Sequence, residues 1–169
     1  MAVEAFQKRE GLALSGLADR ATLIALGPRV YISLAHFSLV LDEPGVPLRR
    51  FPIAHGTDQY PTPTGSFTVI EKVPDPTWLP PDSPWAEGVE PVPPGPGNPL
   101  GTRWIGLTGG MVGIHGTSSP GSIGSRASHG CVRMYVSDVE RLYEMVKVGT
   151  PVTIFGGWES SKELQKYWN

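Results

Sequence analysis

The stretch Ser128-His129-Gly130-Cys131-Val132-Arg133 gathers the only thiol of the chain, an imidazole and a guanidinium around a glycine. A thiol attacks a carbonyl only as its thiolate, and lowering a cysteine pKa from about 8.5 requires a nearby base or positive charge. The candidates for that role are His115, His129 and Arg133. If the stretch is extended, His129 projects to the same face as Cys131, because side chains alternate along a strand. We therefore predict that Cys131 is a nucleophile activated by histidine.

Gly130 suits a second requirement of acyl transfer. A developing oxyanion needs backbone N–H groups that no side chain obstructs, and the amides of Gly130 and Cys131 are the candidates. Downstream, Ser137-Asp138-Val139-Glu140 reads as a capping box that opens a helix over about 137–148, which Gly149 ends. Its apolar face comprises Val139, Leu142, Tyr143 and Val146. The predicted cap is slightly too far from Cys131 for the helix dipole to be a major activator of the thiol, so imidazole must supply most of the activation.

Most of the remaining chain predicts β-structure. The 21 glycines and 18 prolines favour a turn-rich β protein over a helical bundle. Short runs of β-branched, aromatic and alternating apolar residues predict strands at 30–34, 38–41, 48–53, 66–70, 103–107, 112–114 and 152–155. His115 therefore sits where a strand ends. We predict a mainly β fold, a mixed-strand β-sandwich or barrel-like domain with one well-defined helix.

The domain organisation follows from the same pattern. Residues 29–155 form one catalytic domain, residues 1–28 an N-terminal extension and residues 156–169 a C-terminal tail. Residues 73–101 hold most of the prolines and can form little helix or central strand, so we predict an ordered loop or flap there. Its two tryptophans, Trp78 and Trp85, indicate that part of it packs.

Composition limits the class of function. The net charge of −2 and the lack of a basic cluster argue against nucleic-acid binding. The most apolar stretch, 21–41, is interrupted by Pro28, Arg29 and His36, so we expect no membrane span. Residues 1–20 carry scattered acids and bases in place of the basic start and apolar stretch of a secretory signal, and we expect no signal peptide in this chain. His36 and His55 lack partner motifs, and we expect both to be structural.

The chain resembles the L,D-transpeptidase catalytic domain, also called the YkuD domain, over roughly Arg29 to Phe155. The hallmark of that family is a histidine followed, after a loop, by Ser/Thr-His-Gly-Cys and a polar residue. The matching segments are Ile114-His115-Gly116-Thr117, Ser128 to Met134, Pro61-Thr62-Pro63-Thr64-Gly65-Ser66-Phe67 and Gly95-Pro96-Gly97-Asn98-Pro99-Leu100-Gly101.

The resemblance implies site roles. Cys131 is the nucleophile, His115 takes its proton, and the main-chain carbonyl of Gly116 orients the imidazole. Gly130, His129 and Ser128 are assigned to the oxyanion site or its support, and Arg133 and Thr117 to substrate binding. Family members carry Asn or Arg at the position of Arg133.

The resemblance also implies the reaction. The thiolate attacks the carbonyl that joins the L-centre of a diamino acid to a terminal D-alanine in a peptidoglycan stem peptide, D-alanine leaves, and an amine takes the acyl group. Part of the flap covers the substrate. We expect no metal or other cofactor, a monomer in the cell envelope, and covalent addition of carbapenems to Cys131.

Four alternatives remain open at this stage. With water as acceptor the enzyme is an L,D-carboxypeptidase, and cysteine with histidine and arginine on a β-barrel also suits a sortase-like transpeptidase. His115, His129 and Cys131 are proper zinc ligands, and three of them would leave an open catalytic position. A non-enzymatic wall-binding module is the fourth reading. Papain-like proteases are discounted, because they place Cys before His in the chain.

Overall fold

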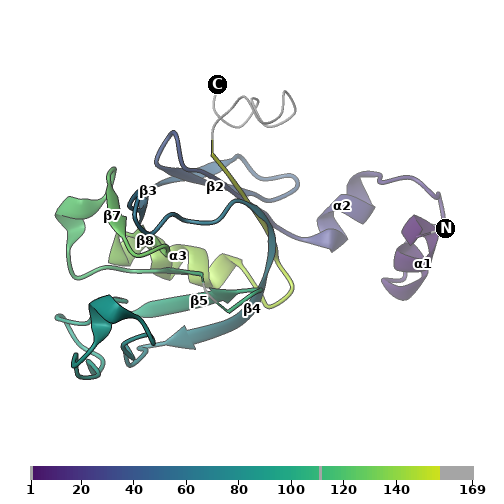
Figure 1. Cartoon of the computed structure of the whole chain (residues 1–169). Helices are drawn as coiled ribbons and strands as arrows, with labels where there is room; N and C mark the ends of the chain where they lie inside the picture. Colours follow the sequence, from purple (N-terminus) through teal and green to yellow (C-terminus); the bar gives the residue numbers. More distant parts are fainter. Residues whose placement is uncertain (1, 111, 157–169) are drawn as a thin grey trace.

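The computed structural model describes residues 2–110 and 112–156 and shows a mainly β protein with three α-helices among these residues (Figure 1). The helices are α1 (Ala2–Arg9), α2 (Arg20–Leu26) and α3 (Val136–Met145), with 3-10 turns η1 (Pro84–Ala86) and η2 (Pro120–Ser122). The strands are β1 (Arg29–Ser33), β2 (Ser38–Asp42), β3 (Arg49–Gly56), β4 (Gly65–Pro74), β5 (Arg103–Leu107), β6 (Gly113–His115), β7 (Arg126–Ser128), β8 (Val132–Met134) and β9 (Pro151–Phe155).

Eight of these strands close into a barrel. The hydrogen-bonded order is β2-β1-β9-β4-β5-β6-β8-β3, and an additional β2–β3 pairing joins the two ends of the sheet. The ninth strand, β7, adds to β3 outside this ring. Three pairs are parallel, β1–β9, β6–β8 and β3–β7, and the others are antiparallel. The predicted mainly β, mixed-strand and barrel-like fold class is therefore confirmed.

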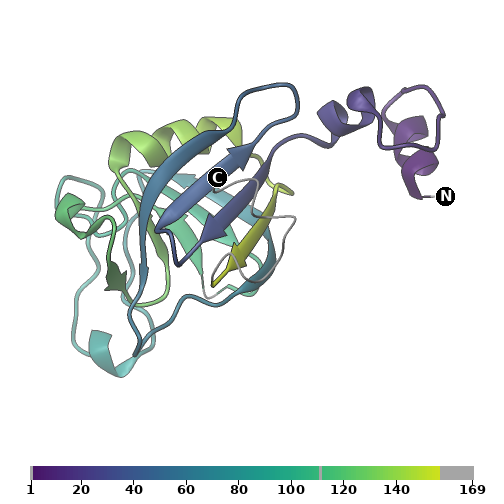
Figure 2. The same cartoon turned by 90° about the horizontal axis from the view of Figure 1, so that it is seen from above.

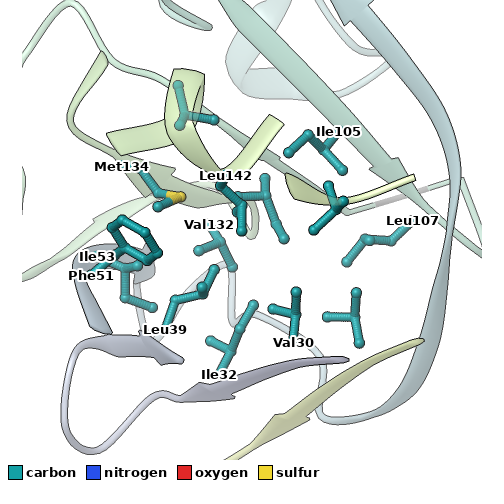
Figure 3. Close-up of a cluster of buried hydrophobic side chains, with 14 of the residues drawn as sticks. Val30, Ile32, Leu39, Phe51, Ile53, Ile105, Leu107, Val132, Met134 and Leu142 are labelled. Carbon is teal, nitrogen blue, oxygen red and sulfur yellow. The ribbon is translucent and has the colours of Figure 1, made fainter. Parts of the chain in front are cut away.

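The hydrophobic core fills the barrel and extends beneath α3 (Figure 3). Alternation along the strands explains it: in β1, Val30 and Ile32 are buried, while Arg29 is exposed. The helix contributes Val139 and Leu142 to the same cluster, and its C-cap residue contributes Val146, as the apolar periodicity predicts. A branched or aromatic side chain gains about 1.5–3 kcal/mol on full burial, so this shared core ties α3 to the barrel.

The boundaries of α3 differ from the predicted ones. The helix begins at Val136, with Tyr135 as N-cap and no side-chain capping hydrogen bond, so the predicted capping box at Ser137 is wrong. Glu140 instead accepts a hydrogen bond from the Thr102 hydroxyl at 2.8 Å. The helix ends at Met145, before the predicted 148, and Gly149 lies in the following turn, where its amide donates to the Val69 carbonyl.

Two helices that the sequence analysis does not predict lie in residues 1–28. Both views show α1 and α2 standing apart from the barrel (Figures 1 and 2). They are joined by the buried Gln7 side chain, whose Nε2 donates to Ser15, Leu17 and Thr22. No helix in the described part of the chain has both the length and the hydropathy to cross a membrane. The predicted C-terminal tail, apart from Gly156, lies outside the described residues.

Candidate active site

The thiol and the imidazole are carried by adjacent strands. In the parallel β6–β8 pair, Ile114 lies opposite Val132 and His115 opposite Arg133. Cys131 comes one residue before β8, so continuing the register sets it beside Gly113. Because paired residues and residues two apart share a face of a sheet, this register directs the side chains of Cys131, His115 and Arg133 to one face, with the buried Ile114 and Val132 on the core side.

The His115 ring is buried and held from two sides. Its Nδ1 lies 2.5 Å from the Gly116 carbonyl oxygen. Since a carbonyl oxygen only accepts, the proton is assigned to Nδ1, which leaves the Nε2 lone pair free. Trp104 stacks on the ring at a centroid distance of 5.9 Å. The Gly116 carbonyl and the Trp104 ring therefore hold the imidazole in one orientation.

Burial keeps His115 neutral. Desolvation and, to a smaller extent, the positive charge of Arg133 outweigh the opposing effect of the Gly116 carbonyl, and together they lower the pKa of His115 from 6.5 to about 4. An imidazole with this pKa is unprotonated at neutral pH, and it can accept a proton from a neighbouring acid.

Cys131 is also neutral in the resting protein. Burial raises the pKa of its thiol, while a hydrogen bond with the Gly113 main chain and the charge of Arg133 act in the opposite direction. The expectation that neighbouring groups lower this pKa is therefore right for Arg133 but wrong for the net effect, because desolvation outweighs them. Both shifts favour the uncharged forms, a thiol and a neutral imidazole, over a preformed thiolate–imidazolium pair.

The loop that carries Cys131 is a tight turn, which corrects the assumption of an extended stretch. Gly130 has φ +117°, a conformation that favours glycine. Ser128 Oγ accepts from the Gly130 amide at 3.1 Å and donates to the Cys131 carbonyl at 2.6 Å. Thr62 Oγ1 donates to the Gly130 carbonyl at 2.7 Å. The Gly130 amide is therefore occupied, whereas the Cys131 amide makes no backbone hydrogen bond within the described residues.

His129 faces aromatic rings. It stacks on Trp85 at a centroid distance of 3.8 Å and an interplanar angle of 10°. Tyr60 contacts it at 4.8 Å, and Trp78 contacts Trp85 at 6.4 Å. Burial and the charge of Arg133 lower the pKa of His129. His129 thus links the Cys131 loop to residues 73–101.

Residues 73–101 are organised by Asn98, whose side chain is fully buried. Its Nδ2 lies 2.8 to 3.1 Å from the carbonyls of Pro76, Val92 and Pro93, and its Oδ1 accepts from the Leu100 amide at 2.8 Å. Reciprocal backbone hydrogen bonds between residues 78 and 92 close the segment into a hairpin-like loop. The proline-rich stretch is therefore folded.

The end of this segment, at Leu100 and Gly101, packs closely against Gly116, the residue after His115. A Cβ atom on Gly116 would lie 3.1 Å from the Leu100 carbonyl oxygen and 3.2 Å from Gly101 Cα. Only a residue without a side chain fits this close approach without displacing its neighbours. The segment thus contacts both the residue after His115 and, through Trp85, the Cys131 loop.

The two predicted substrate-binding residues differ in position. Arg133 is half-buried, and its Nε has no hydrogen-bond partner among the described residues. Thr117 is buried, and its hydroxyl oxygen accepts from the Ser119 amide at 3.0 Å, so in this structure it supports the loop after His115. Direct contact of either residue with substrate stays a prediction.

The three residues considered from the sequence as zinc ligands do not form a metal site. Within residues 2–110 and 112–156, no three His, Cys, Asp or Glu side chains are grouped so that they could hold a metal ion. His129 lies in the aromatic cluster, and His115 uses Nδ1 on a carbonyl.

Sequence reasoning missed Thr62, Asn98 and Trp104 as residues that shape the site. Thr62 and Asn98 lie in two of the segments that carry the family resemblance, so a signal existed, but their hydrogen-bond partners become visible only in the fold. Trp104 precedes a buried isoleucine in β5 and reads as an ordinary strand residue.

Comparison with known proteins agrees with this geometry. The model of the L,D-transpeptidase catalytic domain family matches residues 27–154. A Bacillus licheniformis relative named L,D-transpeptidase YkuD is 34% identical over 126 residues, covering 75% of this chain and 64% of the relative. Its namesake in Bacillus subtilis is 32% identical over 145 residues, covering 86% and 74%. The chain thus spans less than two thirds of the first relative.

Solved structures show the same fold. An L,D-transpeptidase from Mycobacterium smegmatis superposes with a TM-score of 0.64 at 24% identity, covering 76% of this chain and 58% of that protein. Another L,D-transpeptidase, solved in complex with imipenem, superposes with a TM-score of 0.62 at 20% identity, covering 76% and 59%.

Proposed function

This chain belongs to the L,D-transpeptidase catalytic domain family, and from that membership we propose that it is a cysteine acyltransferase acting on peptidoglycan stem peptides. The observation that supports this most directly is the placement of Cys131 and His115 on adjacent parallel strands, with the Gly116 carbonyl on Nδ1 of the imidazole. This arrangement supplies a nucleophile and a base whose orientation is fixed before substrate binds.

The first step moves one proton and forms one bond. As the sulfur of Cys131 approaches the carbonyl carbon of the L-centre to D-alanine peptide bond, Nε2 of His115 takes the thiol proton. The negative charge passes to the carbonyl oxygen, where the Cys131 amide can donate to it. Because both groups are neutral at rest, the proton transfer accompanies the attack.

Collapse of the tetrahedral intermediate releases D-alanine. The carbonyl reforms, the C–N bond breaks, and the imidazolium of His115 returns the proton to the leaving nitrogen, which leaves a thioester on Cys131. An acceptor amine then attacks the thioester and loses its proton to His115, and the thiolate leaves and regains a proton. If water attacks instead, the product is a free acid and the enzyme is an L,D-carboxypeptidase.

Arg133 and the flap are assigned to substrate binding. The Arg133 guanidinium lies close enough to affect the pKa of Cys131, and its buried Nε has no acceptor within residues 2–110 and 112–156, so it suits a carboxylate of the stem peptide. The folded segment 73–101 reaches the Cys131 loop through the Trp85–His129 stack and would cover bound peptide. Water exclusion by such a cover favours transfer to an amine over hydrolysis.

The direct test incubates the protein with a tetrapeptide stem that ends in D-alanine, with and without an amine acceptor. Release of D-alanine and the mass of the product distinguish transfer from hydrolysis, and the thioester should add the acyl mass to the intact protein. Cys131→Ala should abolish all three signals. Absence of release by the wild type, or equal release by Cys131→Ala, would refute the proposal.

Three further expectations belong to the same proposal. One L,D-transpeptidase with this fold was solved in complex with imipenem. We propose that carbapenems acylate Cys131 of this chain, and a measurement of the intact mass would detect the adduct. We place the reaction in the cell envelope, where peptidoglycan lies. We also propose a monomer, which light scattering would test.

A further inference from the structure

The geometry points to Thr62 as a positioning residue for the oxyanion site, and this inference rests on the proposed acyl transfer at Cys131. Thr62 lies between β3 and β4, outside the loop that carries the nucleophile, and it is buried. Its hydroxyl accepts from the Gly56 amide at 2.9 Å and donates to the Gly130 carbonyl at 2.7 Å. Thr62 therefore contacts the catalytic loop at one particular peptide group.

That peptide group joins Gly130 to Cys131. In a planar trans peptide the C=O and the N–H point in opposite directions. When Thr62 holds the Gly130 oxygen, the Cys131 N–H is directed away from the buried Thr62. It makes no backbone hydrogen bond within the part of the chain that the structure describes. Thr62 thus fixes the direction of the amide that we assign to the oxyanion.

The other loop amide cannot take over this role in the same conformation, because the Gly130 N–H donates to Ser128 Oγ at 3.1 Å. Ser128 also donates to the Cys131 carbonyl, so it holds the peptide groups on either side of the one held by Thr62. Gly130 has φ +117°, and it has no side chain that could restrain the rotation of this peptide. The restraint comes from Thr62.

The hydrogen bonds also act in series. The Gly56 amide donates to Thr62, Thr62 donates to the Gly130 carbonyl, and the same peptide presents the Cys131 N–H. Hydrogen bonds in such a chain polarise one another, so the bond to the carbonyl makes the N–H a better donor. Thr62 is therefore expected to act on the charge of the intermediate without touching substrate.

The test separates acylation from simple thiol reactivity. Acylation of Cys131 by p-nitrophenyl acetate passes through an oxyanion: sulfur bonds to the carbonyl carbon, the thiol proton goes to His115, and p-nitrophenolate leaves. Alkylation by iodoacetamide displaces iodide from a saturated carbon and forms no oxyanion. Both rates are followed by intact mass on the whole chain, with Cys131→Ala as the blank.

Thr62→Val keeps the shape of the side chain and removes the hydroxyl. We expect its acylation rate to fall by about tenfold to a hundredfold, which is at or below the loss on deleting an oxyanion donor. Its alkylation rate should stay within about twofold of the wild type, because that reaction has no oxyanion to stabilise. Thr62→Ser retains the hydroxyl and should restore acylation.

Thr150→Val is the matched control. Thr150 is equally buried, and its hydroxyl accepts the Lys147 amide at 3.0 Å in the turn before β9. This control should change neither rate. If Thr62→Val does not fold, the smaller Thr62→Ala provides the second variant, with the same pattern expected.

Two outcomes overturn the inference: unchanged acylation in the folded valine or alanine variant, or an equal loss of acylation and alkylation. The ester assay does not involve peptidoglycan. Normal acylation by the ester without D-alanine release would therefore refute the proposed substrate while leaving the role of Thr62 intact.

Discussion

Replacing His115 by glutamine should remove most of an acid-induced loss of stability. Glutamine is uncharged at every pH, and its amide can still donate to the Gly116 carbonyl that holds Nδ1. The substitution therefore isolates the titration of the buried imidazole. It abolishes the proposed base, so the measured quantity is the free energy of unfolding rather than activity.

The folded and the unfolded protein bind protons at His115 differently, and this difference decides whether stability rises or falls with pH. In the unfolded chain a histidine has its ordinary pKa of about 6.5, whereas burial lowers that of folded His115 to about 4. Between these values the unfolded chain binds a proton that the folded protein does not. The contribution is therefore fully present above pH 6.5 and is lost as the pH falls towards 4.

The magnitude follows from the same pair of values. The folded and unfolded pKa differ by about 2.5. At about 1.4 kcal/mol for each pKa unit, the difference corresponds to about 3.5 kcal/mol in full, of which about 3 kcal/mol is lost by pH 4. That is a large fraction of the about 5–15 kcal/mol that stabilises an ordinary domain.

The assay is urea denaturation of the wild type and His115→Gln at pH 7, 6, 5 and 4. The wild type should lose about 3 kcal/mol more than the variant over this range. His129→Gln serves as control: His129 is exposed, and its substitution should alter the pH dependence far less. Equal losses in the wild type and His115→Gln would refute the assignment of a buried neutral imidazole.

Three other perturbations test the site and its flap. Alkylation of Cys131 by iodoacetamide should accelerate about tenfold for each pH unit between 7 and 9, because the raised pKa leaves little thiolate, and a plateau between pH 5 and 8 would instead indicate an ion pair. Asn98→Ala leaves buried carbonyls without a donor and should lower the free energy of unfolding by about 2–4 kcal/mol, whereas an unchanged urea midpoint would contradict its organising role. Trp85→Ala removes the stack on His129 and should speed amide exchange in residues 76–98 while the barrel amides stay protected; no change would mean that the stack does not hold the flap.

The barrel strands were predictable because their side chains alternate between core and surface. Val30 and Ile32 show this pattern in the sequence and in the structure. The start of α3 was not predictable from local signals. Ser137 followed by Glu140 satisfies the capping pattern, but Glu140 accepts from Thr102 instead, a residue distant in the chain. Tertiary contact overrides the local signal here.

The candidate site also has features that the sequence predicts and features that depend on tertiary contacts. The pairing of His115 with Cys131 could be proposed from their spaced motifs. The stack of His129 on Trp85 could not, because it depends on how residues 73–101 fold back over the loop. The three-residue strands β7 and β8 are likewise too short to show a period, and they form only because β3 and β6 lie beside them.

In the proposed acyl transfer, the neutral resting forms of Cys131 and His115 determine which step needs stabilisation. With a preformed thiolate, the protein would stabilise the charged sulfur already in the ground state, by lowering the pKa of the thiol. Here burial raises that pKa and keeps the imidazole unprotonated, so charge separates only as the thiol attacks. Stabilisation is then needed most at the tetrahedral intermediate, where the negative charge sits on the carbonyl oxygen. We therefore expect the direction of the Cys131 amide, and with it the proposed anchor at Thr62, to affect the rate more than the resting acidity of the sulfur does.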